Sequence, residues 1–198
     1  MQPGGCSPVL QHALKEWAVI CRALAEGKQS LLLRKGGIDE TSGAFQLEHT
    51  RFWLLPTWTH QQRGEIVEAA RPLLEGVEAE RPPAGVLRLT HWAEVTGVYQ
   101  VGGLMPALML AHLHLLSDDA VRKRFAYRSP GLNVLSIRVQ RAAQAHEVAD
   151  RPEYQGCHSW VELHEALSTE GSVPVLDDAA YGDLQKSLDL LLNPTAFA

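Results

Sequence analysis

Four consecutive residues, Arg34-Lys35-Gly36-Gly37, follow a short apolar run and have the composition of an anion-binding turn. Glycines let backbone N–H groups approach a phosphate closely, and the two cations would neutralise its charge. The segment is not a P-loop, because the glycine spacing and the following Ser or Thr of that motif are absent. The alternative is a tight turn with a solvated basic end. All four residues are therefore candidate phosphate ligands.

A second group, Glu48, His49 and His60, has side chains suited to a divalent metal or to acid–base chemistry. Carboxylate and imidazole ligands suit Zn, Mn or Fe, and an open coordination position would activate water. Glu48 and His49 are adjacent, so on a regular strand they point to opposite faces. We expect Glu48 and His60 to be the metal ligands and His49 to be a candidate general base. The alternative is that these histidines are exposed or make ordinary hydrogen bonds.

Cys157, in the run GCHS, is a candidate nucleophile. It precedes an expected helix N-terminus, a position that lowers the pKa of a thiol. Catalysis would also need a separate base, for which His49 and His60 are candidates. The alternative is a small buried residue beside a helix cap.

Arg138 lies between Ile137 and Val139 in an expected strand, so its side chain faces the more polar side of the sheet. It is a further candidate ligand for an anion. The alternative is a structural ion pair with Glu48 or Glu94.

The acid-x-Lys pattern of restriction-type nucleases occurs once, at Glu26-Gly27-Lys28, with Glu16 upstream. That chemistry needs a strand, whereas this segment falls at the end of an expected helix. We therefore interpret it as a helix terminus and loop.

Composition limits the class of protein. Of the 198 residues, 45% are hydrophobic and 21% are charged, as is ordinary for a globular fold. The formal charge of -5 and the pI near 6.0 disfavour a nonspecific nucleic-acid binder but allow a local basic patch. Three cysteines without metal-ligand spacing, no signal-peptide pattern and no long apolar run predict a cytoplasmic protein without disulfides or a membrane segment.

Apolar periodicity and capping residues predict the helices. Leu10, Leu14 and Trp17 recur at helical spacing, and Ser159 with Glu162 has the spacing of a capping box. The expected helices cover residues 8–26, a segment from Thr59 to Leu74, 104–115, 117–125, 160–168 and 177–192.

Short apolar or alternating runs between turn residues predict the strands. They cover 30–35, one or two strands within 45–55 that stop at Pro56, a strand pair or one long bent strand over 86–101, and 132–140. Residues 142–156 are polar and are expected to be irregular.

The strands come in clusters and are not each followed by one helix, which favours an α+β fold over a doubly wound parallel sheet. We expect a flexible tail over 1–6 and a single compact α+β domain over 7–198. Its sheet should be mainly antiparallel or mixed and flanked by helices. Residues 76–85, GVEAERPPAG, are expected to be an internal linker between two subregions.

Three blocks together resemble a known family. The first is ALKEWA at 13–18 leading into LRKGGI at 33–38, the second runs from Glu48 to Gln61, and the third is YQGCHSWV at 154–161. In this order they resemble an uncharacterised bacterial family, domain of unknown function 1802 (DUF1802), over about residues 14–181. The family has no assigned activity. The resemblance implies a restriction-type context and transfers no catalytic residue.

The first functional hypothesis is a binding or accessory module for a small phosphate-bearing ligand or a nucleic-acid-processing partner protein. One alternative is a metal-assisted phosphoester hydrolase or nuclease. The other is a structural homodimer in which the apolar segment 104–116 is exposed. The sequence leaves open whether the protein is an enzyme and whether it is a monomer or a homodimer.

Overall fold

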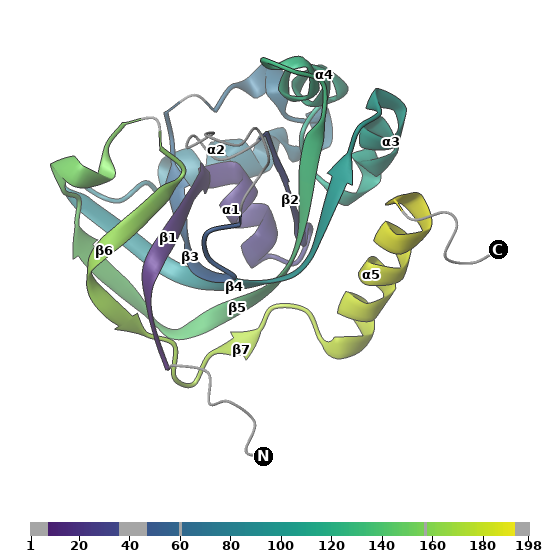
Figure 1. Ribbon diagram of the computed structural model, residues 1–198. Helices are drawn as coiled ribbons and strands as arrows, with labels where there is room; N and C mark the ends of the chain where they lie inside the picture. Colours follow the sequence, from purple (N-terminus) through teal and green to yellow (C-terminus); the bar gives the residue numbers. More distant parts are fainter. Residues whose placement is uncertain (1–7, 36–46, 60, 157, 193–198) are drawn as a thin grey trace.

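The computed structural model describes residues 8–35, 47–59, 61–156 and 158–192 (Figure 1). Within these residues, seven strands form one sheet in the order β2-β5-β4-β3-β1-β6, and β7 pairs with β5. β1 and β3 are parallel, whereas the other pairs are antiparallel, so the sheet is mixed. The strands are β1 (Val9–Trp17), β2 (Leu31–Arg34), β3 (Arg51–Thr57), β4 (Val86–Val101), β5 (Leu132–Ala149), β6 (Trp160–Ser168) and β7 (Val173–Pro174).

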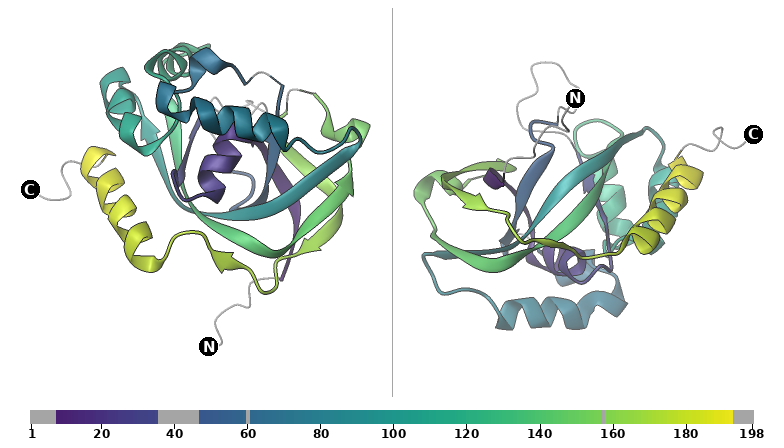
Figure 2. Two further views of the ribbon diagram at one scale, coloured as in Figure 1. Left: turned by 180° about the vertical axis from the view of Figure 1, so that it is seen from behind. Right: turned by 90° about the horizontal axis from the view of Figure 1, so that it is seen from below.

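Helices flank this sheet. Helix α1 (Ala18–Ala25) lies within the curl of the sheet beside β2, and helix α2 (Arg71–Ala79) crosses over α1 (Figures 1 and 2). The described α-helices are α1 (Ala18–Ala25), α2 (Arg71–Ala79), α3 (Leu104–Met109), α4 (Asp118–Ala126) and α5 (Asp178–Leu192), with 3-10 turns at Arg63–Glu65, Glu68–Ala70, Leu110–Leu113 and Pro152–Tyr154. This arrangement confirms the expected compact α+β domain with a mixed sheet. None of the described helices is long and apolar enough to cross a membrane.

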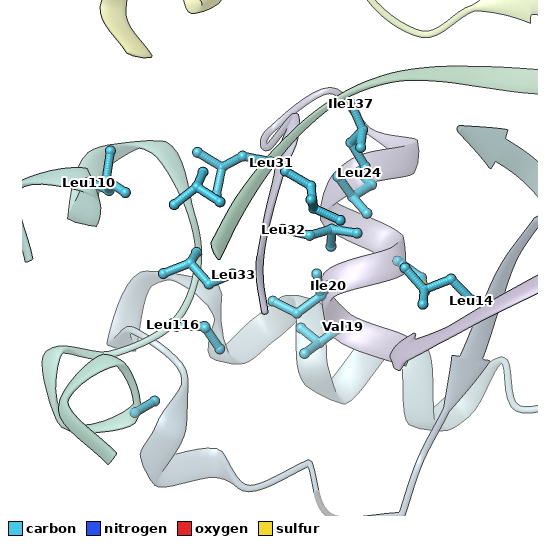
Figure 3. Packing of buried hydrophobic residues seen from close by; sticks show 14 of the residues in the cluster. Leu14, Val19, Ile20, Leu24, Leu31, Leu32, Leu33, Leu110, Leu116 and Ile137 are labelled. Carbon is cyan, nitrogen blue, oxygen red and sulfur yellow. The ribbon is translucent and has the colours of Figure 1, made fainter. Parts of the chain in front are cut away.

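The central strands are buried on both faces. Along β3, Phe52 and Leu54 belong to one hydrophobic cluster, whereas Trp53 and Leu55 belong to another on the opposite face. The first cluster surrounds α1 and β2, and Figure 3 shows Ile20 and other residues of it packed together. The second lies among β1, β3, β4 and β6. Each large side chain in these clusters stabilises the fold by about 1.5–3 kcal/mol through removal from water.

Two irregularities bend the long hairpin of β4 and β5. Register shifts occur between Leu89 and His91 and between Val95 and Gly97 on β4. At the first shift, β5 takes five steps from Arg141 to His146 while β4 takes two. The extra residues on β5 form a bulge, which bends and twists the hairpin. Leu89 and Trp92, on either side of the first shift, belong to the second hydrophobic cluster.

The expected helix over 8–26 is wrong in its first half, because Val9–Trp17 is the strand β1 and the helix begins at Ala18. β1 lies between β3 and β6, and its neighbouring residues Ala13 and Leu14 are both buried. Burial on both faces removes the alternation that identifies a strand. The apolar residues then fitted a helical spacing by chance.

The expected helix over 160–168 is also wrong, because this segment is the strand β6. Val161 and Leu163 are buried, whereas Glu162 and His164 are exposed, which is the period of a strand. The capping-box spacing outweighed this short alternation in the sequence. Residues 142–149 likewise continue β5 instead of forming an irregular segment.

From the sequence, the strand is expected to stop at Pro56. That expectation is wrong, because Pro56 lies within β3. β4 pairs only with Arg51–Trp53, so the N–H that proline lacks is not needed on that side. The helix expected from Thr59 begins only at Arg71, after two 3-10 turns. Residues 76–79 of the expected linker are the last turn of α2.

Other local expectations are confirmed. Residues 31–34 form β2, and 86–101 form one long bent strand. Ser117 caps α4, because its Oγ accepts a hydrogen bond of 3.3 Å from the N–H of Ala120. The last helix, α5, covers 178–192. In α3, Met105 and Met109 are 67% and 52% exposed, and the hypothesis of a homodimer stays a prediction.

Candidate functional site

Lys35 closes the turn between α4 and β5. Its ammonium donates hydrogen bonds to the carbonyl oxygens of Phe125 at 2.9 Å and Gly131 at 2.8 Å, and also to that of Ser129. An ammonium has three N–H donors, so these carbonyls occupy all of them. Lys35 therefore has a structural role in this conformation. Gly36 and Gly37 lie outside the described residues.

Arg34 forms an ion pair with Glu16, with 3.0 Å between Nη1 and Oε2. The side chains are only 15% and 4% exposed. Glu16 also accepts a hydrogen bond of 2.8 Å from the N–H of Trp17, at the junction of β1 and α1. The pair thus joins the end of β2 to the start of α1, and it fixes the position of the Arg34 guanidinium.

Arg138 anchors α5 to β5. Its guanidinium is 2.5 Å from the carboxylate of Asp178 and lies over the ring of Tyr181, at 4.9 Å from the centroid. The sequence suggested an ion pair of Arg138 with Glu48 or Glu94, whereas in the structure Arg138 pairs with Asp178. Arg138 therefore lies with α5 and away from the groove described below.

His49 stacks on His12, with ring centroids 3.6 Å apart and planes at 19°. The edge of Trp160 covers the same ring at 5.1 Å. Burial and the neighbouring His12 lower the pKa of His49. Stacked rings point their nitrogens outward, in parallel planes, so this pair does not chelate one ion. Glu48 is exposed.

His60 and Cys157 lie outside the described residues. The expected metal pair of Glu48 and His60 is therefore not tested, and neither is the expected nucleophile. In the part of the chain that the structure describes, no three His, Cys, Asp or Glu side chains are grouped as a metal site would require.

A groove of about 790 Å³ opens where β1 and β3 end. We call it the Lys15 groove. Its walls are β1 and β3, the connection that leads into β4, and the segment that precedes β6. It is lined by Lys15, Arg34, Leu55, Pro56, Thr57, Trp58, Thr59, Arg81, Pro82, Pro83, Ala84, Gly85, Val86, Leu87, Asp150, Tyr154, Gln155, Gly156, His158 and Ser159. All three blocks that carry the family resemblance contribute to this lining.

The Lys15 groove is locally basic. Among the described residues that line it, Lys15, Arg34 and Arg81 are cations and Asp150 is the carboxylate. Asp150 accepts hydrogen bonds of 2.8 and 2.9 Å from the side-chain amide of Gln155. A concave surface lined mainly by one sign of charge concentrates the electrostatic field on an incoming ion. The groove is therefore suited to an anion, although the whole chain is acidic.

Lys15 lies on β1 beside the segment before β6, and its backbone N–H donates a hydrogen bond of 2.9 Å to the carbonyl oxygen of Ser159. Its Nζ donates to the carbonyl oxygen of Gly156 at 3.2 Å and lies 3.5 Å from Nε2 of His158. The cation is thus positioned against the segment before β6. On the strand, Lys15 alternates with the buried Leu14, so its side chain points away from the α1 core.

Arg81 lies over the ring of Trp58, with its Cζ at 5.3 Å from the centroid. Trp58 is held by a hydrogen bond of 3.2 Å from its Nε1 to the carbonyl oxygen of Val77 in α2. Within the described residues, no carboxylate pairs with Arg81, so its guanidinium charge is left uncompensated. A cation on an aromatic face remains able to bind an oxyanion through its N–H edge.

Sequence reasoning missed Lys15 and Arg81. From the sequence, Lys15 falls within the expected helix over 8–26 and Arg81 within the expected linker over 76–85. The half-buried lysine between the buried residues Leu14 and Glu16 was a signal only once β1 was known to be a strand. For Arg81, the available signal was a cation directly before Pro82-Pro83, which orders the chain locally.

Comparison with known proteins supports the resemblance. The model of a family described as a domain of unknown function, DUF1802, matches residues 13–187. No curated protein matches the chain. Among solved structures, the fold is similar to that of ASCH from Zymomonas mobilis, with a TM-score of 0.46 and 13% identity over 88% of this chain and 93% of that one. A variant of the same protein gives a TM-score of 0.46 and 12% identity over 89% and 94%. The family match spans most of the chain, so the protein belongs to the DUF1802 family.

Proposed function

We propose that this protein is a binding module for a phosphate-bearing ligand, which it holds in the Lys15 groove. One observation carries the proposal. In a chain with a net charge of -5, three cations from separate parts of the sequence line one groove, namely Lys15, Arg34 and Arg81. Phosphate oxygens are bound most strongly by such charge-assisted hydrogen bonds.

The three cations differ in what they offer. Arg34 is held rigidly by Glu16, whose carboxylate offsets much of its charge, so Arg34 contributes a guanidinium in a fixed position in the groove lining. Arg81 can present two parallel N–H donors to an oxyanion while its other face rests on Trp58. Lys15 provides a point charge from β1, beside the segment before β6. A ligand with two phosphates would contact Lys15 and Arg81 at once.

The proposal covers two kinds of phosphate-bearing ligand. A small phosphate-bearing molecule and the end of a nucleic acid share the same phosphate chemistry, so the groove suits either. A metal-assisted hydrolase also stays a prediction, since it depends on His60, which lies outside the described residues.

Isothermal titration calorimetry at low salt tests the proposal. The probes are inorganic pyrophosphate and a short single-stranded oligonucleotide. Lys15→Ala and Arg81→Ala are each expected to weaken binding about tenfold, because each removes a charge-assisted contact. The control is Lys186→Ala, which removes one positive charge from an exposed pair with Asp183 on α5. Equal affinities in all three variants would overturn the proposal.

The two probes separate the two ligand classes. Tighter binding of pyrophosphate identifies a small-molecule site. Tighter binding of the oligonucleotide, with a steep loss of affinity as salt is raised, identifies a nucleic-acid site. If the wild type binds neither probe, the proposed function is wrong.

A further inference from the structure

A second groove lies on the other side of Trp58, between α1 and the bent part of the β4–β5 hairpin. It has a volume of about 870 Å³. It shares Pro56, Trp58 and Pro82 with the Lys15 groove, so the two are separated only by this ridge. We call the second one the Arg141 groove. Its volume is within the range of small-molecule sites, about 300–1,000 Å³.

Arg141 and His91 face each other at one end of this groove. They are register partners on β5 and β4, which places their side chains on the same face of the sheet. Arg22 of α1 lines the same groove and acts electrostatically on His91. Three nitrogen-bearing side chains from three elements thus surround one space.

The guanidinium of Arg141 is uncompensated. Arg22 is paired with Glu26 at 3.4 Å and also with Glu80, and Arg88 is paired with Glu147 at 2.7 Å. For Arg141, by contrast, the described residues supply neither an ion pair nor a hydrogen bond. A planar guanidinium with its donors free is well suited to bind an oxyanion in a bidentate manner.

His91 adds a neutral donor. Burial lowers its pKa to about 4, with further contributions from the positive charges of Arg141 and Arg22, so the ring is uncharged at neutral pH. Its Nδ1 is 2.8 Å from the hydroxyl oxygen of Thr90, which holds the ring in place. A neutral imidazole carries one N–H, and it can donate this to an anion beside Arg141.

Beside these groups the groove has small apolar walls, and its polar lining residues include Arg88, Gln144 and the two carboxylates that pair with Arg22, Glu26 and Glu80. One wall is the surface of α1, and another is the bulge of β5, where the four residues 142–145 lie opposite one residue of β4. The small apolar residues of these walls are Ala18, Cys21, Ala25, Ala142, Ala143 and Ala145. Short side chains leave room for a flat apolar group, which would gain free energy from burial.

We propose that the Arg141 groove is a second binding site, which takes a phosphomonoester carried on a flat apolar body, as in a mononucleotide. Arg141 and His91 bind the phosphate oxygens, whereas Arg22 stays paired with Glu26 and Glu80 beside them. The base lies against α1 and the β5 bulge. This site does not depend on ligand binding in the Lys15 groove.

Adenosine monophosphate is the probe for this site, with inorganic phosphate and adenosine as separate titrations. We expect the monophosphate to bind more tightly than either part alone. Arg141→Gln should weaken its binding about tenfold, since a bidentate charged contact is lost. The matched control is Arg122→Gln on α4, because Arg122 is exposed and is not ion-paired within the described residues.

Two further variants test the apolar wall and the independence of the two grooves. Ala145→Trp fills the groove without a change in charge and should also weaken binding. Lys15→Ala should leave it unchanged, which distinguishes this site from the Lys15 groove. If Arg141→Gln and Arg122→Gln bind adenosine monophosphate equally, or if the wild type binds it no better than inorganic phosphate, the inference is wrong. Loss of binding in Lys15→Ala alone would also contradict it.

Discussion

Glu16 and Arg34 form an ion pair at 3.0 Å, with both side chains largely removed from solvent, where β1 meets α1 and β2 ends. The pair ties together two segments that the sequence separates by a helix. It also places a guanidinium in the lining of the Lys15 groove. One contact thus links the stability of the fold to the electrostatics of the proposed site.

Arg34→Met should destabilise the protein by about 3–5 kcal/mol, because it leaves the Glu16 carboxylate buried without its partner. The free energy of unfolding in urea measures this. The double variant Glu16→Gln/Arg34→Met should recover much of the loss. As a control, Arg63→Ala breaks an exposed pair with Glu75 and should cost less than about 1 kcal/mol. A loss in Arg34→Met as small as in the control would show that the pair is unimportant.

Lys35→Met should destabilise the protein by roughly 1–3 kcal/mol, because the carbonyl oxygens of Phe125 in α4 and of Gly131 before β5 lose a charged donor. The affinity for pyrophosphate should not change. Thermal melting and calorimetry on the same sample measure both quantities. If the affinity falls while the stability is unchanged, Lys35 binds phosphate as the sequence suggested, and the turn-closing role is wrong.

Arg138→Ala should loosen α5 without affecting the Lys15 groove. The variant loses the contacts with Asp178 and with the ring of Tyr181. Amide hydrogen exchange should become faster in residues 178–192, and pyrophosphate should bind as tightly as before. Unchanged exchange in α5, together with weaker binding, would place Arg138 among the ligand-binding residues instead.

Acid should destabilise the protein through His114. Burial lowers the pKa of His114 to about 4, Arg124 and His112 add to the shift, and Asp118 opposes it. Above pH 6.5 the ring is neutral in the folded and the unfolded chain. As the pH falls from 6.5 to 4, only the unfolded chain gains the proton, so stability decreases by roughly 3 kcal/mol, at about 1.4 kcal/mol per pKa unit.

His114→Asn tests that assignment. Asparagine keeps an acceptor for the N–H of Leu116, which bonds to Nδ1 of His114 at 3.2 Å, but it does not titrate. The difference in unfolding free energy between wild type and variant should shrink as the pH is lowered from 7 to 4. A difference that is constant over this range would show that His114 titrates normally.

The sequence predicted the fold class because strand clusters and turn residues are local signals. It identified β2, the long β4 and the capped start of α4 for the same reason. It could not identify β1, since burial of Ala13 and Leu14 on opposite faces hides the alternation. Tertiary packing decides such a segment, and local periodicity does not report it.

The site was harder to predict than the fold. Of the residues proposed from the sequence, Arg34 lines the Lys15 groove, whereas Lys35 and Arg138 are engaged in structural contacts elsewhere. Lys15, Trp58 and Arg81 meet only because β1 lies parallel to β3 and the connection after α2 folds over both. Convergence of this kind depends on strand pairing between distant segments, which residue spacing does not encode.

The most direct test is a nuclear magnetic resonance titration of the wild-type protein with inorganic pyrophosphate. Backbone amide signals and the tryptophan indole N–H signals are followed together. We predict saturable shifts at Lys15, Gly156 and Arg81 and at the indole of Trp58, with none around Lys186. Shifts that avoid these residues, or no shifts at millimolar pyrophosphate, would contradict the assignment of the Lys15 groove as a phosphate site.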